Sequence, residues 1–327
     1  MNKQTGVALL LVLMVMAILA TVAVEISGRT QLALKRTMHM ANNEQGYWYA
    51  ISAEELAKKV LKQDLDDAKG KVNLQQFWAS DNIVFPVDEA QLAGKIKDMR
   101  ACFNVNALAQ APSNAEQQLS KQALATRQLQ SLLESLQLNG AAAEQLSHGI
   151  ADFVDSDSET APYGAEDADY EARPIPYRAA NTLLQHKSEL RSILGINERT
   201  YFAIKDLVCA IPGNQSQVLN VNTLDQEHGA ILSAMLLGAV TVDEAANIIS
   251  RRPAEGWDSL NDFWQDSGVD SNALEANVKS TLVISSDYFE LQAGVQIDGN
   301  VFLLSSILKK SNNNQMKVLS RQLGGQQ

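Results

Sequence analysis

The sequence predicts an α+β fold in which a long N-terminal helix and an antiparallel sheet are joined to a large all-α insertion. Three observations predict this fold class. An apolar run opens the chain and passes into an amphipathic helical pattern that continues to about residue 64. The residues after 281 alternate between apolar and polar types around an Asp298-Gly299-Asn300 turn, which is typical of a β-hairpin. Residues 105–280 are rich in Ala, Leu, Gln and Glu, with few strand signals.

The apolar run covers residues 7–24 and contains no charged side chain. At about 1.5 Å per residue a helix of this length is about 27 Å long, close to the roughly 30 Å hydrocarbon core of a bilayer. A secretory signal peptide has a small-x-small cleavage motif after its apolar region, whereas here Gly6 precedes the run. We therefore predict a short leader that is cut after Gly6 and a helix that stays in the membrane. Lys3 favours a cytoplasmic N-terminus, which puts the rest of the chain in the periplasm.

The Gly6-Val7 junction resembles the prepilin-peptidase site of type IV pilins and type II secretion pseudopilins. This resemblance implies cleavage between Gly6 and Val7 and methylation of the new terminal amine of Val7. Members of that family usually carry a glutamate five residues into the mature chain, and here that position is Leu11. With this departure the sequence resembles the K-class minor pseudopilins (the GspK family). An ordinary N-terminal membrane anchor is the alternative.

The resemblance covers nearly the whole chain and implies a pilin-like fold with an all-α inserted domain. Asn104-Val-Asn-Ala-Leu and Asn220-Val-Asn-Thr-Leu are near copies, and each first asparagine is predicted to cap a helix. The expected parts are a leader (1–6), a spine helix (7–64, transmembrane over 7–24), the first part of a pilin head (65–104), a helical insertion with an acidic metal loop (105–215), a second helical unit (216–280) and the C-terminal strands of the head (281–327).

Within these parts the residue pattern predicts individual elements. A linker that contains Trp78 is expected between Gly70 and Pro86, and an extended segment or strand pair from Gln91 to Phe103. The helical patterns cover residues 116–136, 141–153, 182–194 and 200–207. The alternating patterns predict strands at 288–297, 301–308 and 316–319.

Carboxylates concentrate between residues 152 and 171. Asp155, Asp157 and Glu159 occupy places 1, 3 and 5 of an EF-hand-like loop, and Glu166 falls at place 12. The sixth place is Thr160 instead of glycine, so we expect a calcium loop that is not an EF-hand. The resemblance to the K class implies calcium in the helical insertion, with ligands drawn from Asp155, Asp157, Glu166, Asp167 and Asp169, and with Asp152 and Asn181 as weaker candidates. A solvated acidic loop is the alternative.

Cys102 and Cys209 are the two cysteines of the chain. In an oxidising compartment such as the periplasm two cysteines can form one disulfide. Two buried thiols are the alternative, and the sequence does not decide between them.

The resemblance implies a non-enzymatic minor pseudopilin at the tip of a periplasmic pseudopilus. Its implied partners are the I- and J-class minor pseudopilins, the prepilin peptidase, the inner-membrane assembly platform and, before assembly, the inner membrane. Residues 213–263 also resemble helix-hairpin-helix modules, so a membrane-anchored nucleic-acid-binding protein of a DNA-uptake apparatus is one alternative. The net charge of −11 argues against that partner. A periplasmic enzyme on a simple anchor is the second alternative, but the sequence contains no catalytic constellation that we can identify.

Overall fold

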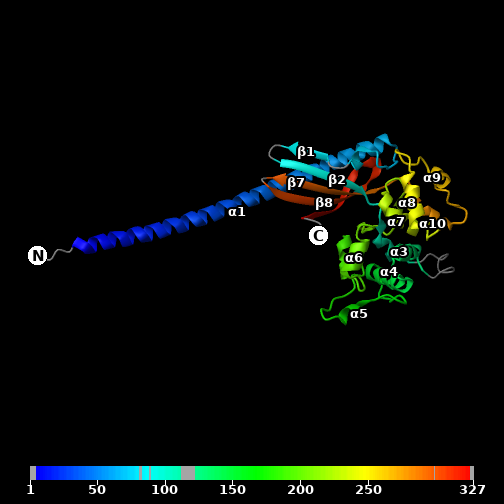
Figure 1. The fold of residues 1–327 in the computed structure, drawn as a ribbon, viewed down its shortest axis with the longest axis horizontal. Helices are drawn as coiled ribbons and strands as arrows, with labels where there is room; N and C mark the ends of the chain where they lie inside the picture. Colours follow the sequence, from blue (N-terminus) through cyan, green and yellow to red (C-terminus); the bar gives the residue numbers. More distant parts are fainter. Residues whose placement is uncertain (1–4, 81–82, 88–89, 112–121, 298, 325–327) are drawn as a thin grey trace.

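The structure is a computed structural model that describes residues 5–80, 83–87, 90–111, 122–297 and 299–324. Helix α1 (Thr5–Asp67) projects far out of a folded body, and its C-terminal part packs along one side of that body (Figure 1). In the apolar half of α1 an 18-residue window has a mean hydropathy of 3.0, and none of it is buried. In the second half Ala50, Leu61 and Leu65 are buried against a sheet. Leader residues 1–4 lie outside the described ranges.

The sheet has the strand order β1-β2-β7-β8-β9 and is antiparallel throughout. Leu291, Ala293 and Val295 alternate along one face and pack in the same core as α1, as the period of two predicts. Gly299 has a φ of +78° in the hairpin that joins β7 to β8. Asp298 of the predicted turn lies outside the described residues. The strands are β1 (Ile83–Val87), β2 (Ala90–Asp98), β7 (Tyr288–Ile297), β8 (Asn300–Lys310) and β9 (Met316–Leu323).

The predicted linker from Gly70 to Pro86 is wrong in its last part, because residues from Ile83 onward form β1. Proline cannot donate a ladder hydrogen bond, which argues against a central strand. β1 is an edge strand, however, so Pro86 needs a partner on one side only and pairs with Gln91. Trp78 belongs to the head core as well, since it is buried and packs edge-on against Phe289.

The insertion between β2 and β7 is helical. Its first part contains α3 (Leu124–Ser135), α4 (Gly140–Val154), α5 (Asp167–Glu171) and α6 (Glu198–Ile204), and its second part contains α7 (Gly229–Met235), α8 (Val242–Ser250), α9 (Leu260–Ser267) and α10 (Ala276–Ser280). Of the helix predicted over 116–136, residues 116–121 lie outside the described ranges. The helix predicted over 182–194 is wrong, because only a 3₁₀ turn at Lys187–Ser192 forms. The side chain of Asn106 bonds both the N–H and the C=O of Leu184 (2.8 and 2.9 Å), so helical hydrogen bonds cannot use them.

The two parts of the insertion share an internal plan. Each begins with a two-residue strand that ends at the first asparagine of the Asn-Val-Asn motif. This strand pairs in parallel with a short strand at the end of the same part: β3 (Phe103–Asn104) with β4 (Val208–Cys209), and β5 (Leu219–Asn220) with β6 (Leu282–Val283). The second asparagine of each motif clamps a later backbone segment. Asn106 clamps Leu184, and Asn222 bonds the N–H and C=O of Trp257 at 2.8 and 3.0 Å. The second asparagines of the two identical tripeptides therefore have equivalent structural roles.

The prediction that the first asparagine of each motif caps a helix holds for one copy. Asn104 accepts from the N–H of Asn106 at the start of a 3₁₀ helix, Val105–Ala109. Asn220 accepts from Asn222 in the same way, but a turn follows instead of a helix. Its Nδ2 donates to the carboxylate of Asp98 at 2.9 Å, so it joins the end of β2 to the second helical part.

An ion pair between a buried glutamate and a partly exposed arginine fixes α1 to the far edge of the sheet. Glu54 is fully buried and its two oxygens accept from Nε and Nη2 of Arg321 at 2.8 Å, while Ser306 donates at 2.6 Å. Burial alone would raise the pKa of Glu54, but the hydrogen bonds from Arg321 and Ser306 outweigh it and the pKa is lowered. The carboxylate is therefore charged and paired at neutral pH.

Candidate metal centre

The acidic loop begins where α4 ends. Asn139 caps the start of α4, and Asp155 is the first residue after its last turn. A carboxylate at the C-terminal end of a helix faces the negative end of the helix dipole, which is unfavourable unless a cation lies nearby. The loop then returns to the same place, because Glu166 directly precedes α5.

Three carboxylates converge in this loop. Asp155, Asp157 and Glu166 each offer an oxygen, and these oxygens all lie within 4.8 Å of one another. Asn181 belongs to the same neighbourhood, since its Nδ2 donates to the backbone C=O of Asp157 at 2.9 Å. In the part of the chain that the structure describes, no other set of three His, Cys, Asp or Glu side chains comes this close together.

The oxygen atoms of this group lack the partners that buried polar atoms normally have. Both carboxylate oxygens of Glu166, Oδ1 of Asp155 and Oδ1 of Asn181 are buried and make no hydrogen bond of normal geometry within the described chain. An unsatisfied buried acceptor costs about 1–3 kcal/mol, and more when it is charged. A hard cation with oxygen ligands would satisfy all four atoms at once.

The electrostatics of the group agree with this geometry. Burial, followed by the charge of Asp157, raises the pKa of Asp155 to about 6. Burial, with added repulsion from Asp152 and Asp155, raises the pKa of Glu166, and the nearby Asn181 side chain offsets this in part. The negative charge on one carboxylate of the group thus makes ionisation of its neighbours less favourable. Residues that repel each other in a pocket of unpartnered oxygens fit a divalent cation, and calcium suits an all-oxygen set of carboxylates and an amide.

Other predicted ligands hold the loop instead of joining the group. Asp152 accepts from the N–H of Ala161 at 3.0 Å, and a side chain at Gly164 would lie 1.8 Å from its Oδ2. Asp167 accepts from the N–H of Ala179 at 3.0 Å, and Asp169 accepts from the N–H of Glu166 at 3.1 Å. These three carboxylates therefore position the loop around the converging oxygens.

Glu159 is also outside the group. It is exposed, and its N–H donates to Oδ1 of Asp157 at 2.9 Å in a tight turn. The EF-hand spacing thus identifies places 1, 3 and 12 of the group but not place 5. The contribution of Asn181 has no counterpart in that spacing, because Asn181 approaches from a separate loop.

Cys102 and Cys209 form a disulfide. The bond lies next to the β3–β4 ladder, where Asn104 pairs with Cys209. It joins positions 107 residues apart, so it closes the whole first part of the insertion, which includes the acidic loop.

The segment that resembles a helix-hairpin-helix module does form a helical hairpin. Leu237 and Gly238 between α7 and α8 have positive φ values of 53° and 75°. The first turn of α8 carries Asp243 and Glu244, and hydrogen bonds from Thr241 lower the pKa of Glu244. A phosphate at this hairpin would face two carboxylates, so the hairpin is unsuited to nucleic acid.

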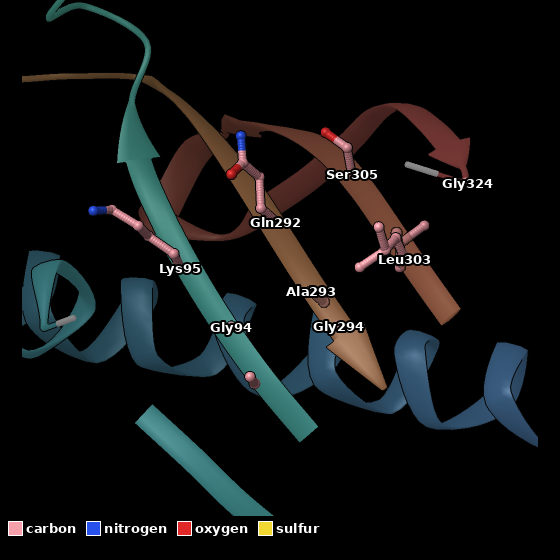
Figure 2. Close-up of a pocket in the computed structure, with 10 residues that line it drawn as sticks. Gly94, Lys95, Gln292, Ala293, Gly294, Leu303, Ser305 and Gly324 are labelled. Atoms are coloured by element: carbon pink, nitrogen blue, oxygen red, sulfur yellow. The ribbon is translucent and has the colours of Figure 1, made fainter. Parts of the chain in front are cut away.

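The face of the sheet away from α1 carries a hollow of about 620 Å³ (Figure 2). Lys95, Gln292 and Ser305 are cross-strand neighbours on β2, β7 and β8, and Gly294 leaves room because it has no side chain. Lys95 is the one titratable side chain in the described lining. The hollow therefore does not offer the paired acid and base groups of an enzymatic cleft.

Comparison with known proteins identifies the family. Residues 101–213 and 219–285 match two family models, both described as type II secretion system (T2SS), protein K. A type II secretion system protein K of Aeromonas hydrophila is 34% identical over 327 residues, which covers 99% of this chain and 98% of that protein. The chain belongs to the type II secretion system protein K family.

Further relatives extend this result. The protein K of Pectobacterium carotovorum subsp. carotovorum is 35% identical over 328 residues, covering 99% of this chain and 98% of the relative. A crystal structure of the GspK–GspI–GspJ complex from enterotoxigenic Escherichia coli contains a chain with 32% identity and a TM-score of 0.78, covering 89% of this chain and 100% of that one. The predicted K-class membership and the pilin-like fold with a helical insert are confirmed.

Proposed function

We propose that this member of the protein K family is a non-enzymatic subunit at the tip of the periplasmic pseudopilus, where it initiates or caps assembly. The observation that carries the proposal is the division of α1 into an uncovered apolar half and a half packed under the head. Such a helix can be held in the inner membrane as a single pass and later pack among other apolar helices. The C-terminal body then lies in the periplasm.

Leu11 supports the tip position. A carboxylate at this place would need a cationic partner from a neighbouring subunit, and a buried unpaired charge costs several kcal/mol. A subunit with no neighbour above it avoids that cost with leucine. Figure 1 adds a steric argument, because the insertion lies beyond the end of α1 that is remote from the N-terminus and covers the end of the head. A second head stacked on that end would meet the insertion.

Calcium is the proposed ion of the acidic loop, with Asp155, Asp157, Glu166 and Asn181 as the side chains that would hold it. Asp152, Asp167 and Asp169 would keep the loop in place around the ion, as their backbone hydrogen bonds indicate. Bound calcium would neutralise the repulsion among the carboxylates and stabilise the first part of the insertion. Its role is then structural, and no reaction step depends on it.

The proposed partners are the I- and J-class minor pseudopilins, since the similar GspK chain was solved in a complex with GspI and GspJ. The prepilin peptidase would cut between Gly6 and Val7 and methylate Val7, and the inner-membrane assembly platform would receive the mature subunit. Both steps are proposed from the N-terminal sequence alone.

Two measurements test this function. Mass spectrometry of the protein purified from its own host is expected to give a mature chain that begins with methylated Val7. Deletion of the gene is expected to abolish export of the host's type II substrates, and the wild-type chain should restore it. An intact Met1 in the mature protein, or full export in the deletion strain, would contradict the proposal.

A further inference from the structure

A short loop at the far end of the insertion presents one apolar side chain to solvent. The loop runs from Arg173 to Tyr177 and follows α5, which lies at the edge of the molecule in Figure 1. Ile175 in its middle is 81% exposed, the highest value among the large apolar side chains that the structure describes. Membrane insertion accounts for exposed apolar residues in α1, but it does not account for this one.

The loop is held in shape by its sequence and its contacts. Pro174 and Pro176 fix φ on both sides of Ile175. The hydroxyl of Tyr177 donates to the C=O of Ser192 at 2.5 Å, and its ring packs on the buried ring of Tyr170 with centroids 5.2 Å apart. An exposed apolar residue on a rigid loop loses little conformational freedom when it binds, which is typical of an interface anchor.

The same loop carries a positive charge on Arg173. The guanidinium of Arg173 stacks over the Tyr177 ring at 5.2 Å and donates to the Tyr177 hydroxyl. No carboxylate within the described ranges lies at ion-pair distance from Arg173. Its charge is therefore fixed over the Tyr177 ring, two residues along the chain from Ile175, and available to a partner.

We propose that residues 173–177 are a docking loop for a protein that offers an apolar pocket to Ile175 and a carboxylate at the rim of that pocket to Arg173. A bilayer is a poorer fit, because stable attachment to lipid takes two apolar signals or one plus a polybasic patch. The loop has one apolar anchor and one unpaired cation. Burial of a single isoleucine in a protein pocket changes affinity by about tenfold to a hundredfold.

The docking loop is also tied to the acidic loop. The N–H of Ala179 is held by Asp167, and Asn181 is held by the C=O of Asp157. Calcium would therefore stiffen the docking loop from its C-terminal side. The stiffening by calcium rests on the proposed calcium site. The evidence for the docking loop itself, namely the exposure of Ile175 and the two flanking prolines, is independent of calcium.

The test places the photoreactive residue benzoylphenylalanine at position 175 of the full-length chain in secreting cells. Irradiation is expected to give one major protein adduct, and Arg173→Glu is expected to lower its yield at least tenfold. The same probe at Phe202, which is 56% exposed on α6, serves as the matched control and should not give this adduct. Ile175→Asp should reduce export at least tenfold, whereas Phe202→Asp should leave it unchanged.

Several results would overturn the proposal: adducts with phospholipid alone, adducts with a second copy of this chain alone, no protein adduct, or normal export by Ile175→Asp. Mass spectrometry identifies the adduct, and irradiation of the two purified proteins must reproduce it. A deletion strain that still exports would point to failure of the proposed secretion function instead. Glu166→Gln in the same cells reports separately on the calcium step.

Discussion

At the scale of single residues, the acidic loop of the metal-free chain combines converging carboxylates with buried oxygens that lack hydrogen-bond partners. Two like charges 4 Å apart cost about 4 kcal/mol at an effective dielectric constant of 20. Asp155, Asp157 and Glu166 have oxygens within 4.8 Å of each other, and several of these atoms lack hydrogen bonds. The same arrangement becomes favourable with a divalent cation, so the loop should couple calcium to stability.

Replacement of Glu166 by glutamine should remove most of that coupling. At a calcium concentration of 100 times Kd, binding stabilises the folded state by about 2.7 kcal/mol, which corresponds to a Tm increase of roughly 4 °C for a chain of this size. Glu166→Gln keeps the shape but removes the buried charge, and we expect little or no increase. Differential scanning calorimetry with calcium and with a chelator measures both values.

Glu159→Gln is the matched control for this prediction. It makes the same chemical change in the same loop, but Glu159 is exposed and outside the converging group. We expect its calcium-dependent Tm increase to equal that of the wild type. If Glu159→Gln loses the response and Glu166→Gln keeps it, the assignment of the ligands is wrong.

The raised pKa of Asp155 predicts a pH dependence of the metal-free protein. Its pKa is about 6 in the folded chain against 3.8 for the free side chain, so the folded state binds more protons between these values. The free energy of unfolding therefore falls as the pH rises through this window. Asp155→Asn should stabilise the metal-free protein at pH 7 by about 1 kcal/mol, allowing for solvent screening.

The stabilising effect of Asp155→Asn should be much smaller at pH 4, because the carboxyl is then protonated in the folded chain and close to its own pKa of 3.8 in the unfolded chain. Chemical denaturation of both proteins at pH 7 and pH 4 in the presence of a chelator provides the comparison. Equal stability of the two proteins at pH 7 would contradict the repulsion that we assign to this loop.

The sequence predicts much of this site because three of its carboxylates lie in one short loop, where their spacing can be read without knowledge of the tertiary fold. Asp155, Asp157 and Glu166 follow from their places in the loop, although the same argument also selects Glu159. Asn181 and the supporting bonds of Asp167 and Asp169 depend on how the loop folds back. The sequence spacing cannot separate a carboxylate that faces the ion from one that holds a backbone N–H.

At the scale of elements, the sequence predicts those with a strong period and misses those set by distant contacts. The helix over 7–64 and the strand over 288–297 follow from periods of 3.6 and 2 and match α1 and β7 within a few residues. The predicted helix at 182–194 fails because Asn106 binds the backbone of Leu184 from 78 positions away. No local pattern reports that contact.

The pair formed by Glu54 and Arg321 should be the strongest single polar link between α1 and the sheet. Its residues are 267 positions apart, so the sequence gives no sign of it. Arg321→Met would leave Glu54 buried with Ser306 as its partner but without a cation, and we expect a loss of about 1–3 kcal/mol, since the Arg321 side chain is itself partly exposed. Thermal unfolding of the full-length protein in detergent should show a lower Tm for the head.

The double variant Glu54→Met, Arg321→Met tests the reason for this loss. Both charges are gone, so no unpaired charge stays buried, and stability should return close to the wild-type value. The pKa of Glu54 is lowered in the folded state, so the pair stabilises the head at neutral pH and loses this effect as the pH falls through the folded pKa. A single variant as stable as the wild type at pH 7 would contradict the role of the pair.

At the scale of the whole molecule, the two helical parts and the sheet are joined at a few buried points. Asp98 at the end of β2 accepts from Thr223 at 2.6 Å and from Asn220 at 2.9 Å, so the head sheet contacts the second part directly. The disulfide of Cys102 and Cys209 closes the first part next to the same strand end. The acidic loop and the docking loop are thus carried by a body fixed to the head.

Leu11 lies in the apolar half of α1, the part of the molecule that is proposed to pack among other subunits in the pseudopilus. Leu11→Glu should be cleaved and methylated like the wild type, because the change lies beyond the Gly6-Val7 junction. At the proposed tip no subunit above it supplies a terminal amine, so the new carboxylate would be buried without a partner at a cost of several kcal/mol. We therefore expect normal processing by mass spectrometry together with reduced export, whereas the isosteric control Leu11→Gln should export more than Leu11→Glu. Loss of processing in Leu11→Glu, or export at the wild-type level, would show that this position does not act through an unpaired charge at the tip.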